Sequence, residues 1–481
     1  MISLVFRRSI ALALAVIVVN ASAAQDRCQG TDRAGDRRPV PADPYPVMAA
    51  GWGPELGAGL MASRWAEDWS GLAAVAQAPS LKGMSFGQDG NLTFSSELRL
   101  RHVGHHNAQL QGRGNTQQTQ LRAVFGADLR LTPEWRLYTE VGTAQVAGQR
   151  AVAKPNFQNR ASLQQVFVEG RMMTGAVLLG AMLGRQEFSD GPRQLISLSD
   201  GPNLHRSWNG LRLYAHGKRQ RWGAYELRGT QLGGAGFDER IDSGERLRGL
   251  NASFIVSDGT GPNTYFDPFW IESRQPALRV AEQLGPDHRH SLGARLWGRR
   301  GDVRFDWTLV RQFGNGAGES IDAWALFAAQ SFPLSSGPWK PRFTTRVDIA
   351  SGARKHGFNP LYASSNYFSE AQFLSLRNLR AFTPGLAMSP SASTTLSLEY
   401  SYAERIDAAD AVYASPTRRY ADTEYVEGRH IGNLTRLSAA WATSPRLRLK
   451  LSLEHMEAGA LLHRAGFSSG YYGYLEATYR Y

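Results

Sequence analysis

The sequence predicts an all-β protein, a transmembrane antiparallel β-barrel of about 18 strands. Three observations predict this fold: an N-terminal secretory signal, short segments in which apolar and polar residues alternate, and connections whose lengths alternate along the chain. The 481-residue chain has a mean hydropathy of −0.35, and after residue 24 no apolar run reaches the ~20 residues that a membrane helix needs. A polytopic helical membrane protein is therefore excluded.

The first 24 residues have the pattern of a secretory signal. Arg7 and Arg8 precede an apolar core at 10–19, and the small residues at 21–24 suit cleavage. We assign residues 1–24 to the signal peptide, 25–90 to a periplasmic N-terminal leader and 91–481 to the barrel. Cys28 is the single cysteine, which excludes an intramolecular disulfide and any Cys-rich metal site. We expect no cofactor and no bound metal.

Strict alternation of apolar and polar residues indicates strands with one face toward lipid and one toward water. In residues 447–454, leucine alternates with Arg448, Lys450, Ser452 and Glu454. The same pattern predicts strands at 91–101, 120–131, 135–147, 163–170, 176–185, 208–214, 222–230, 248–256, 263–272, 290–298, 303–312, 321–332, 341–350, 378–389, 394–402, 431–442, 447–454 and 471–481.

The connections between these segments alternate in length. They are mostly short after even strands, and long after odd strands, at 102–119, 186–207, 231–247, 273–289, 351–377, 403–430 and 455–470. Short turns at one end and long loops at the other are typical of outer-membrane barrels, with the short turns in the periplasm. Closure satisfies the backbone hydrogen bonds that lipid cannot. About 18 strands predict a lumen wide enough for a channel.

Basic residues outnumber acidic ones on the face that alternation assigns to the lumen. Rings of arginine and lysine favour anions, and arginine binds carboxylates through two parallel hydrogen bonds. The alternative is that these arginines pair with Glu and Asp on adjacent strands and hold the barrel in shape. The candidate lumen residues are Arg99, Arg101, Arg122, Arg130, Arg212, Arg295, Arg342, Arg346, Arg448 and Lys450.

Several stretches, taken in order, resemble one family. They are Arg64 to Ser70 followed by Asn91 to Arg101, Leu183 to Glu187 followed by Asp200 to Asn203 and Arg206 to Arg212, Gln312 to Gly314, and Phe358 to Tyr362. Together they resemble alginate export outer-membrane proteins over residues 64–481. The resemblance implies an 18-stranded barrel in the bacterial outer membrane. Through it an anionic polysaccharide, the polyuronate alginate, would leave the cell by passive diffusion past an arginine-lined constriction.

The resemblance also singles out residues around the long loop 186–207. Arg185, Arg206 and Arg212 lie within the matched stretches, so we expect them to contact carboxylates of the substrate. For Arg185 and Arg206, anchoring of the loop through acidic residues is the alternative. Expected partners are outer-membrane lipid and anionic polysaccharide, with periplasmic polysaccharide-export proteins as further candidates.

Other functions have weaker support. The run Asp287 to Ser291 contains two histidines between polar residues, but no recognisable partner completes a catalytic site, so we expect no enzyme. A net charge of +12 without a basic run or binding motif does not favour nucleic acid. A porin for small anions such as organic acids remains open, as does a structural barrel with a plugged lumen.

Overall fold

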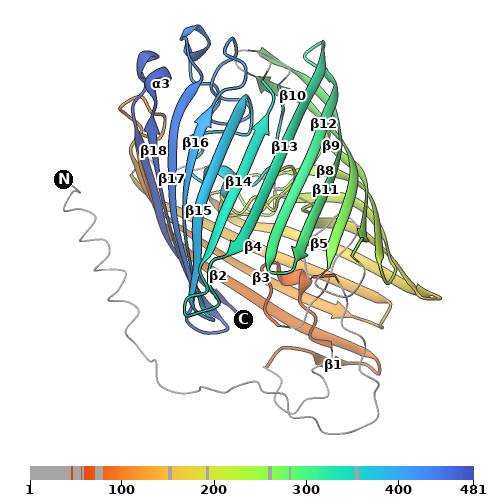
Figure 1. Cartoon of the computed structure of the whole chain (residues 1–481). Coiled ribbons are helices and arrows are strands. Elements are labelled where there is room, and N and C mark those ends of the chain that lie inside the picture. Colours follow the sequence, from red (N-terminus) through yellow and green to blue (C-terminus); the bar gives the residue numbers. More distant parts are fainter. Residues whose placement is uncertain are drawn as a thin grey trace. The chain divides into compact units, whose positions relative to one another are not determined.

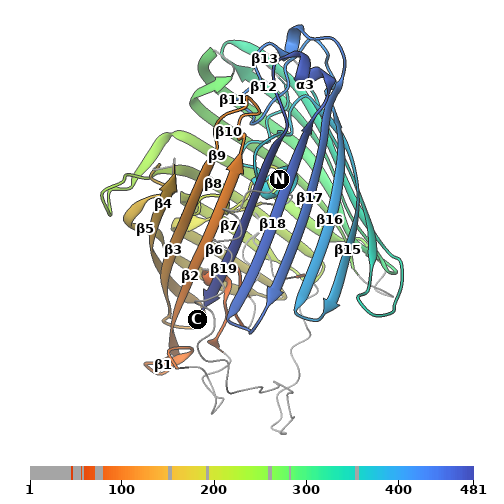
Figure 2. The ribbon, with the colours of Figure 1, turned by 90° about the vertical axis from the view of Figure 1, so that its left-hand side faces the viewer.

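A computed structural model describes residues 45–46, 56, 59–70, 80–149, 154–190, 194–257, 263–280, 283–352 and 357–481. Eighteen antiparallel strands, β2 to β19, form a closed barrel. Each strand pairs with the next in sequence, and β19 pairs with β2 from Tyr471 against His106 to Arg480 against Glu97. Figure 1 shows the barrel wall, and Figure 2 shows β2 beside β19 where the wall closes.

The strands tilt together around the barrel (Figure 1). Their bounds are β1 Met84–Phe86, β2 Gly90–His106, β3 Thr116–Arg130, β4 Trp135–Gln149, β5 Asn159–Thr174, β6 Val177–Glu187, β7 Ser207–His216, β8 Gln220–Gln231, β9 Arg240–Ile255, β10 Thr264–Val280, β11 Gln283–Arg300, β12 Val303–Gly316, β13 Glu319–Pro333, β14 Arg342–Ala350, β15 Leu379–Ser391, β16 Thr394–Glu404, β17 His430–Ala442, β18 Leu447–Ala458 and β19 Gly470–Arg480.

Short helical segments lie between the strands or before them. They are the 3-10 helices η1 (Arg64–Ala66) and η3 (Thr423–Tyr425), and the α-helices α2 (Ser365–Phe368) and α3 (Ala460–Arg464). Among the described residues, no helix is long and apolar enough to cross a membrane.

The predicted barrel is confirmed, and each of the predicted strands overlaps one of β2 to β19. The loop predicted at 273–289 is wrong, because β10 and β11 continue through most of it. The two strands skip register between Gln275 and Leu278, which leaves Pro276 and Pro286 outside the ladder. A bulge of this kind accommodates prolines that cannot donate a ladder hydrogen bond. The strand β1, which pairs with the start of β2, was not predicted.

Alternation separates the two faces of the wall as predicted. Large apolar side chains such as Leu100, Phe125 and Leu309 are exposed on the outer face, while Arg99, Arg101 and Arg122 are buried on the inner face. The C-terminus lies at the end of the barrel with the short turns, near β1 (Figure 1). The signal peptide at 1–24 and Cys28 lie outside the described residues.

Candidate functional site in the barrel lumen

The lumen is built from inner-face side chains of the strands and from chain segments that contact them. Of the basic residues predicted to face it, ten lie on the inner face of a strand: Arg99, Arg101, Arg122, Arg130, Arg212, Arg295, Arg342, Arg346, Arg448 and Lys450. Whether any of them contacts a substrate stays a prediction. Their surroundings differ sharply from one side of the barrel to the other.

Arg185 does not face the lumen. It has the parity of Leu183, which is 63% exposed on the outer face, rather than that of the buried Met182. Its guanidinium donates to Asn209 Oδ1 at 3.0 Å and to the Leu163 carbonyl at 3.0 Å, and lies 3.7 Å from Glu239. Arg185 therefore holds outer-face groups together at the rim, which is a correction to its predicted role.

In the connection between β6 and β7, residues 188–206, the stretch 200–205 lies against the inner faces of β2 and β3. Arg99 donates to the Asp200 and Pro202 carbonyls at 3.0 and 2.8 Å, and Arg101 donates to the Gly201 carbonyl at 3.0 Å. Arg122 reaches Asp200 Oδ1 at 3.2 Å. These three predicted lumen arginines are therefore occupied by the loop, which we name the latch loop. Arg206, at its end, lies over the Tyr362 ring at 4.6 Å.

His205 completes the charge pattern of the latch loop. Its Nε2 lies 3.0 Å from Asp200 Oδ1, and its Nδ1 contacts Glu187. Burial by itself lowers the pKa of His205, but the carboxylates of Glu187 and Asp200 outweigh burial and raise the pKa to about 9. Burial would raise the pKa of Asp200, yet His205, Arg122 and Arg99 hold it well below its usual range. At neutral pH one carboxylate thus faces three cations.

A segment before the first barrel strand also lies inside the wall. In residues 59–70, Trp65 packs with the inner-face side chains Tyr138, Phe167 and Tyr214, and its indole donates to Glu187 at 3.1 Å. Arg136 donates to the Trp65 carbonyl at 2.5 Å. The sequence placed this segment in a leader outside the barrel, and its packing in the lumen was missed.

Two inner-face arginines beside this segment form ion pairs, one with the segment and one with neighbouring strands. Arg130 lies 3.0 Å from Asp68, and Arg136 lies 2.7 Å from Asp128 and 3.2 Å from Glu169. Arg130 is therefore paired, but with Asp68 of this segment and not with an acidic residue on an adjacent strand, as the alternative interpretation had it. Residues 64–70 are rich in charged and aromatic residues. This composition was the one feature of the sequence that could have indicated buried contacts between this segment and the barrel.

Toward the ends of the strands that carry the long loops, those loops pack into an apolar core. Leu195 and Ile196 of the latch loop share it with Phe358, Phe368 and Phe373 of the connection between β14 and β15, and with inner-face residues of β8, β9, β10, β12 and β13. Near it, Arg346 pairs with Asp348 at 2.8 Å, and its guanidinium lies 5.0 Å from the Tyr367 ring. Loop packing therefore fills this half of the lumen.

Two more predicted residues are tied into the wall. Arg295 makes hydrogen bonds with both Asp306 carboxylate oxygens, at 2.8 and 2.7 Å. Arg212 lies 4.9 Å from the Phe188 ring at the start of the latch loop, and donates to Gln186 at 3.4 Å. Both side chains are buried.

A polar cavity of about 410 Å³ lies toward the other end of the barrel, near the short turns. Its lining includes Arg304, Lys340, Arg342 and Lys450 and a single acidic residue, Glu370. Arg342 donates to Ser331 Oγ and to the Asp302 carbonyl, both at 2.7 Å, and Lys450 lies 3.5 Å from Glu476. Within the described residues, Arg304, Lys340 and Arg342 form no ion pair with a carboxylate. We name this the basic cavity.

The sequence identified two residues of the basic cavity among its candidate sites, Arg342 and Lys450. Arg448 lies two residues from Lys450 on the same face and is exposed. Lys340 was missed because it lies in the connection 334–341, outside the alternating strands. The backbone has positive φ values at Trp339 and Lys340, and no sequence pattern indicated this conformation. Arg304 has inner-face parity on β12, as the alternation of this strand predicts.

The histidine-containing run at 287–291 is divided by the wall. Asp287, Arg289 and Ser291 are buried on the inner face of β11, while His288 and His290 lie on its outer face. An arrangement in which either histidine activates Ser291 is therefore ruled out by alternation.

Comparisons with known proteins place the chain among channels. A family model described as alginate export matches residues 91–474. No curated protein matches the sequence.

Solved structures share the fold at low identity. OccK2 (OpdF) of Pseudomonas aeruginosa, in complex with glucuronate, has a TM-score of 0.51 at 11% identity, covering 81% of this chain and 97% of that one. A BenF-like porin from Pseudomonas fluorescens Pf-5 has a TM-score of 0.55 at 9% identity, with coverage of 81% and 98%. Pseudomonas aeruginosa OpdK with vanillate has a TM-score of 0.54 at 10% identity, with coverage of 82% and 100%.

Proposed function

This chain belongs to the alginate export family of outer-membrane β-barrel channels, and we propose that it passes an anionic polysaccharide, an alginate-like polyuronate, out of the cell by passive diffusion. The observation that carries the proposal is the basic cavity. Four basic side chains face one acidic side chain there, and three of the four have no ion pair among the described residues. Such charges attract carboxylates that pass through the lumen.

The chemistry of the cavity suits a polymer that binds weakly at many points. Passage requires several weak sites rather than one tight site, because a tightly bound segment would leave too slowly. Arg304 and Arg342 offer guanidinium groups that hold a carboxylate through two hydrogen bonds, whereas Lys340 and Lys450 act as point charges. The glucuronate bound in the OccK2 complex is a uronate, which supports recognition of such carboxylates by this fold.

A porin for small organic acids is the second candidate. The basic cavity, at about 410 Å³, is large enough for one or two sugar-sized molecules, and the related OpdK structure holds vanillate, a small carboxylate. Both candidates require an anion-favouring lumen, but they differ in the length of the solute that it retains.

Conductance measurements in planar bilayers distinguish these candidates. We expect alginate oligomers to reduce the current through the purified protein at concentrations where a neutral oligosaccharide of the same length has no effect. Free glucuronate should act only at much higher concentration, since a single carboxylate gains none of the multivalent advantage. Equal block by glucuronate and by the oligomer would favour the small-acid porin, and absence of block by either would contradict both.

A further inference from the structure

Two rows of charged residues cross four adjacent strands on the outer face of the barrel. The upper row joins Arg228, Arg246, Arg274 and His288, each directly opposite the next on β8, β9, β10 and β11. The lower row joins Glu226, Arg248, Glu272 and His290 in the same way. Both rows have the parity of exposed apolar side chains such as Leu250 and Leu292, so they face outward.

The rows lie directly beside an aromatic border. Trp270 stacks on His290 with ring centroids 5.8 Å apart, and His290 stacks on Phe313 at 5.2 Å. Below them on β9 and β11 follow Leu250 and Leu292. Aromatic girdles mark the level of the lipid headgroups in outer-membrane barrels. The rows lie toward the ends of β8 and β10 that are opposite the short turns, so the adjacent headgroups belong to the outer leaflet.

The charges of the rows do not balance. Glu226 lies 2.8 Å from Arg248 and also contacts Arg246, while Glu272 lies 2.7 Å from Arg274 and 3.7 Å from Arg248. Three arginines thus share two carboxylates, and the fourth, Arg228, donates to the Ser243 carbonyl at 2.9 Å. In the upper row, basic residues lie directly opposite one another on neighbouring strands, which by itself is destabilising. A bound anion would relieve this repulsion.

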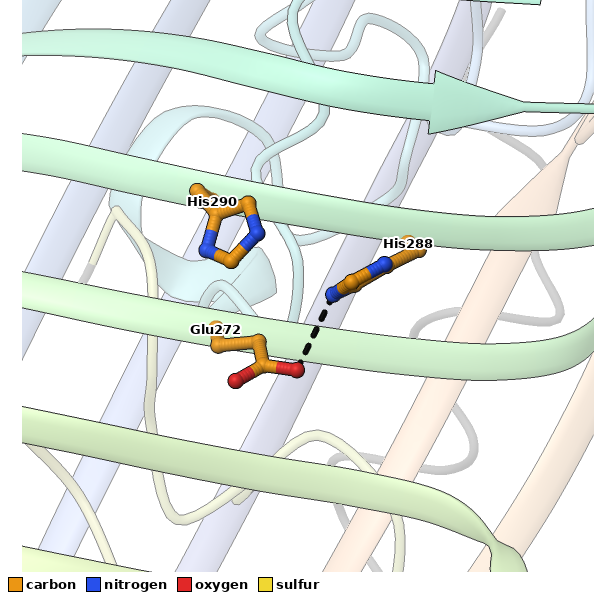
Figure 3. Close-up of side chains that lie close together, drawn as sticks. All are labelled: Glu272, His288 and His290. Atoms are coloured by element: carbon orange, nitrogen blue, oxygen red, sulfur yellow. Dashed lines mark hydrogen bonds and ion pairs between the residues drawn. The ribbon is translucent and has the colours of Figure 1, made fainter.

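Glu272, His288 and His290 could also suggest a metal site, and Figure 3 shows them close together on two strands. Their ligand atoms lie within 4.8 Å of one another, and His288 Nε2 lies 2.9 Å from Glu272 Oε1. However, the Glu272 carboxylate already has Arg274 and Arg248 beside it. A divalent cation there would bring further positive charge to a carboxylate that already has two guanidinium groups beside it. The local charge therefore favours an anion over a metal ion.

We propose that these rows bind the phosphate groups of an anionic glycolipid headgroup in the outer leaflet. The upper row supplies guanidinium groups for the phosphate oxygens, and the aromatic border and apolar band below it lie against the sugar and acyl chains. This site is on the opposite face of the wall from the basic cavity, so it does not depend on what passes through the lumen.

The test uses native mass spectrometry and lipid titration of the full-length protein in detergent, with lipid A carrying two phosphates as the probe. We expect Arg246→Gln with Arg274→Gln to weaken lipid A binding at least about tenfold, because two charge-assisted contacts are lost. The matched control is Arg311→Gln, an outer-face arginine of β12 that pairs with Asp322 outside the rows. Arg246→Lys with Arg274→Lys should retain most binding, which separates loss of charge from loss of structure.

Each remaining outcome contradicts the proposal. Unchanged lipid A binding by the Gln variant, at wild-type barrel yield, would show that the rows do not hold the lipid. Binding of phosphatidylethanolamine as tight as that of lipid A would remove the role of anionic charge. Displacement by millimolar inorganic phosphate would indicate a site for free anions, and tight Zn²⁺ binding lost in His288→Ala would indicate a metal site.

Discussion

Reversing two charges in the basic cavity, by Arg304→Glu with Arg342→Glu, is expected to change the channel from anion-favouring to cation-favouring. Two unit charges about 4 Å apart interact by about 1 kcal/mol even in bulk water, and a reversal turns each attraction of an anion into a repulsion. The ratio of anion to cation permeability should fall by about tenfold or more, because about 1.4 kcal/mol is a factor of ten. The measurement is the reversal potential across a planar bilayer in a KCl gradient.

The control for this prediction changes the net charge equally but outside the lumen. Arg311 and Arg380 lie on the outer face, where they pair with Asp322 and Glu404, and both are more than half exposed. Arg311→Glu with Arg380→Glu should leave the reversal potential where it is in the wild type. Arg346 is unsuitable for the lumen variant although it faces inward, because its pairing with the fully buried Asp348 makes its loss a structural defect. A reversal potential that does not move in the Arg304 and Arg342 variant would refute the assignment of those side chains to the ion path.

Removing the Asp200 side chain, by Asp200→Ala, is expected to release the latch loop and raise the single-channel conductance. Arg99, Arg122 and His205 all lose the same carboxylate, and the two arginines are almost fully buried. Removing one partner of a buried ion pair costs about 3–5 kcal/mol, because it leaves the other charge buried without compensation. We expect a cost at the lower end of this range, since a third of the Asp200 side chain is exposed. About 3 kcal/mol corresponds to roughly a hundredfold gain in the detached state.

Hydrogen exchange of residues 188–206 and single-channel recordings measure this release together. The matched control is Asp238→Ala, in the connection between β8 and β9, where the carboxylate accepts hydrogen bonds from the backbone amides of Ala235 and Gly236 in its own loop. That variant should keep wild-type conductance and wild-type exchange in the latch loop. If Asp200→Ala exchanged no faster than the wild type there, the three cations would have other sufficient partners.

The wall of the barrel could be predicted from the sequence, because each strand must repeat the same two-residue pattern to meet lipid and water. Residues 447–454 carry that pattern without exception, and β18 covers them. The predicted strand at 176–185 contains Gly180 and Gly184, which have no side chain to set the phase, so alternation did not show that Arg185, proposed from the family resemblance, faces outward. Pro276 and Pro286 led to a predicted loop where β10 and β11 in fact continue past a bulge.

The contents of the lumen could not be predicted in the same way. Alternation shows which arginines face inward, but not which of them meet a carboxylate brought from elsewhere in the chain. Arg99 meets Asp200, Arg130 meets Asp68 and Arg101 meets Glu476. Each of these pairs depends either on the pairing of the first and last barrel strands or on a chain segment that folds into the lumen. Neither event produces a local pattern in the sequence.

The central claim is that the inner face divides into a part filled by chain segments and a positively charged, water-accessible cavity. Its most direct test is thiol labelling of two inner-face threonines, Thr395→Cys in the basic cavity and Thr308→Cys, which is 1% exposed, in a Cys28→Ser background. We predict that Thr395→Cys reacts faster with an anionic thiosulfonate than with a cationic one of equal size, and that Thr308→Cys reacts with neither. Equal labelling of both positions, or faster reaction of Thr395→Cys with the cationic reagent, would contradict the claim.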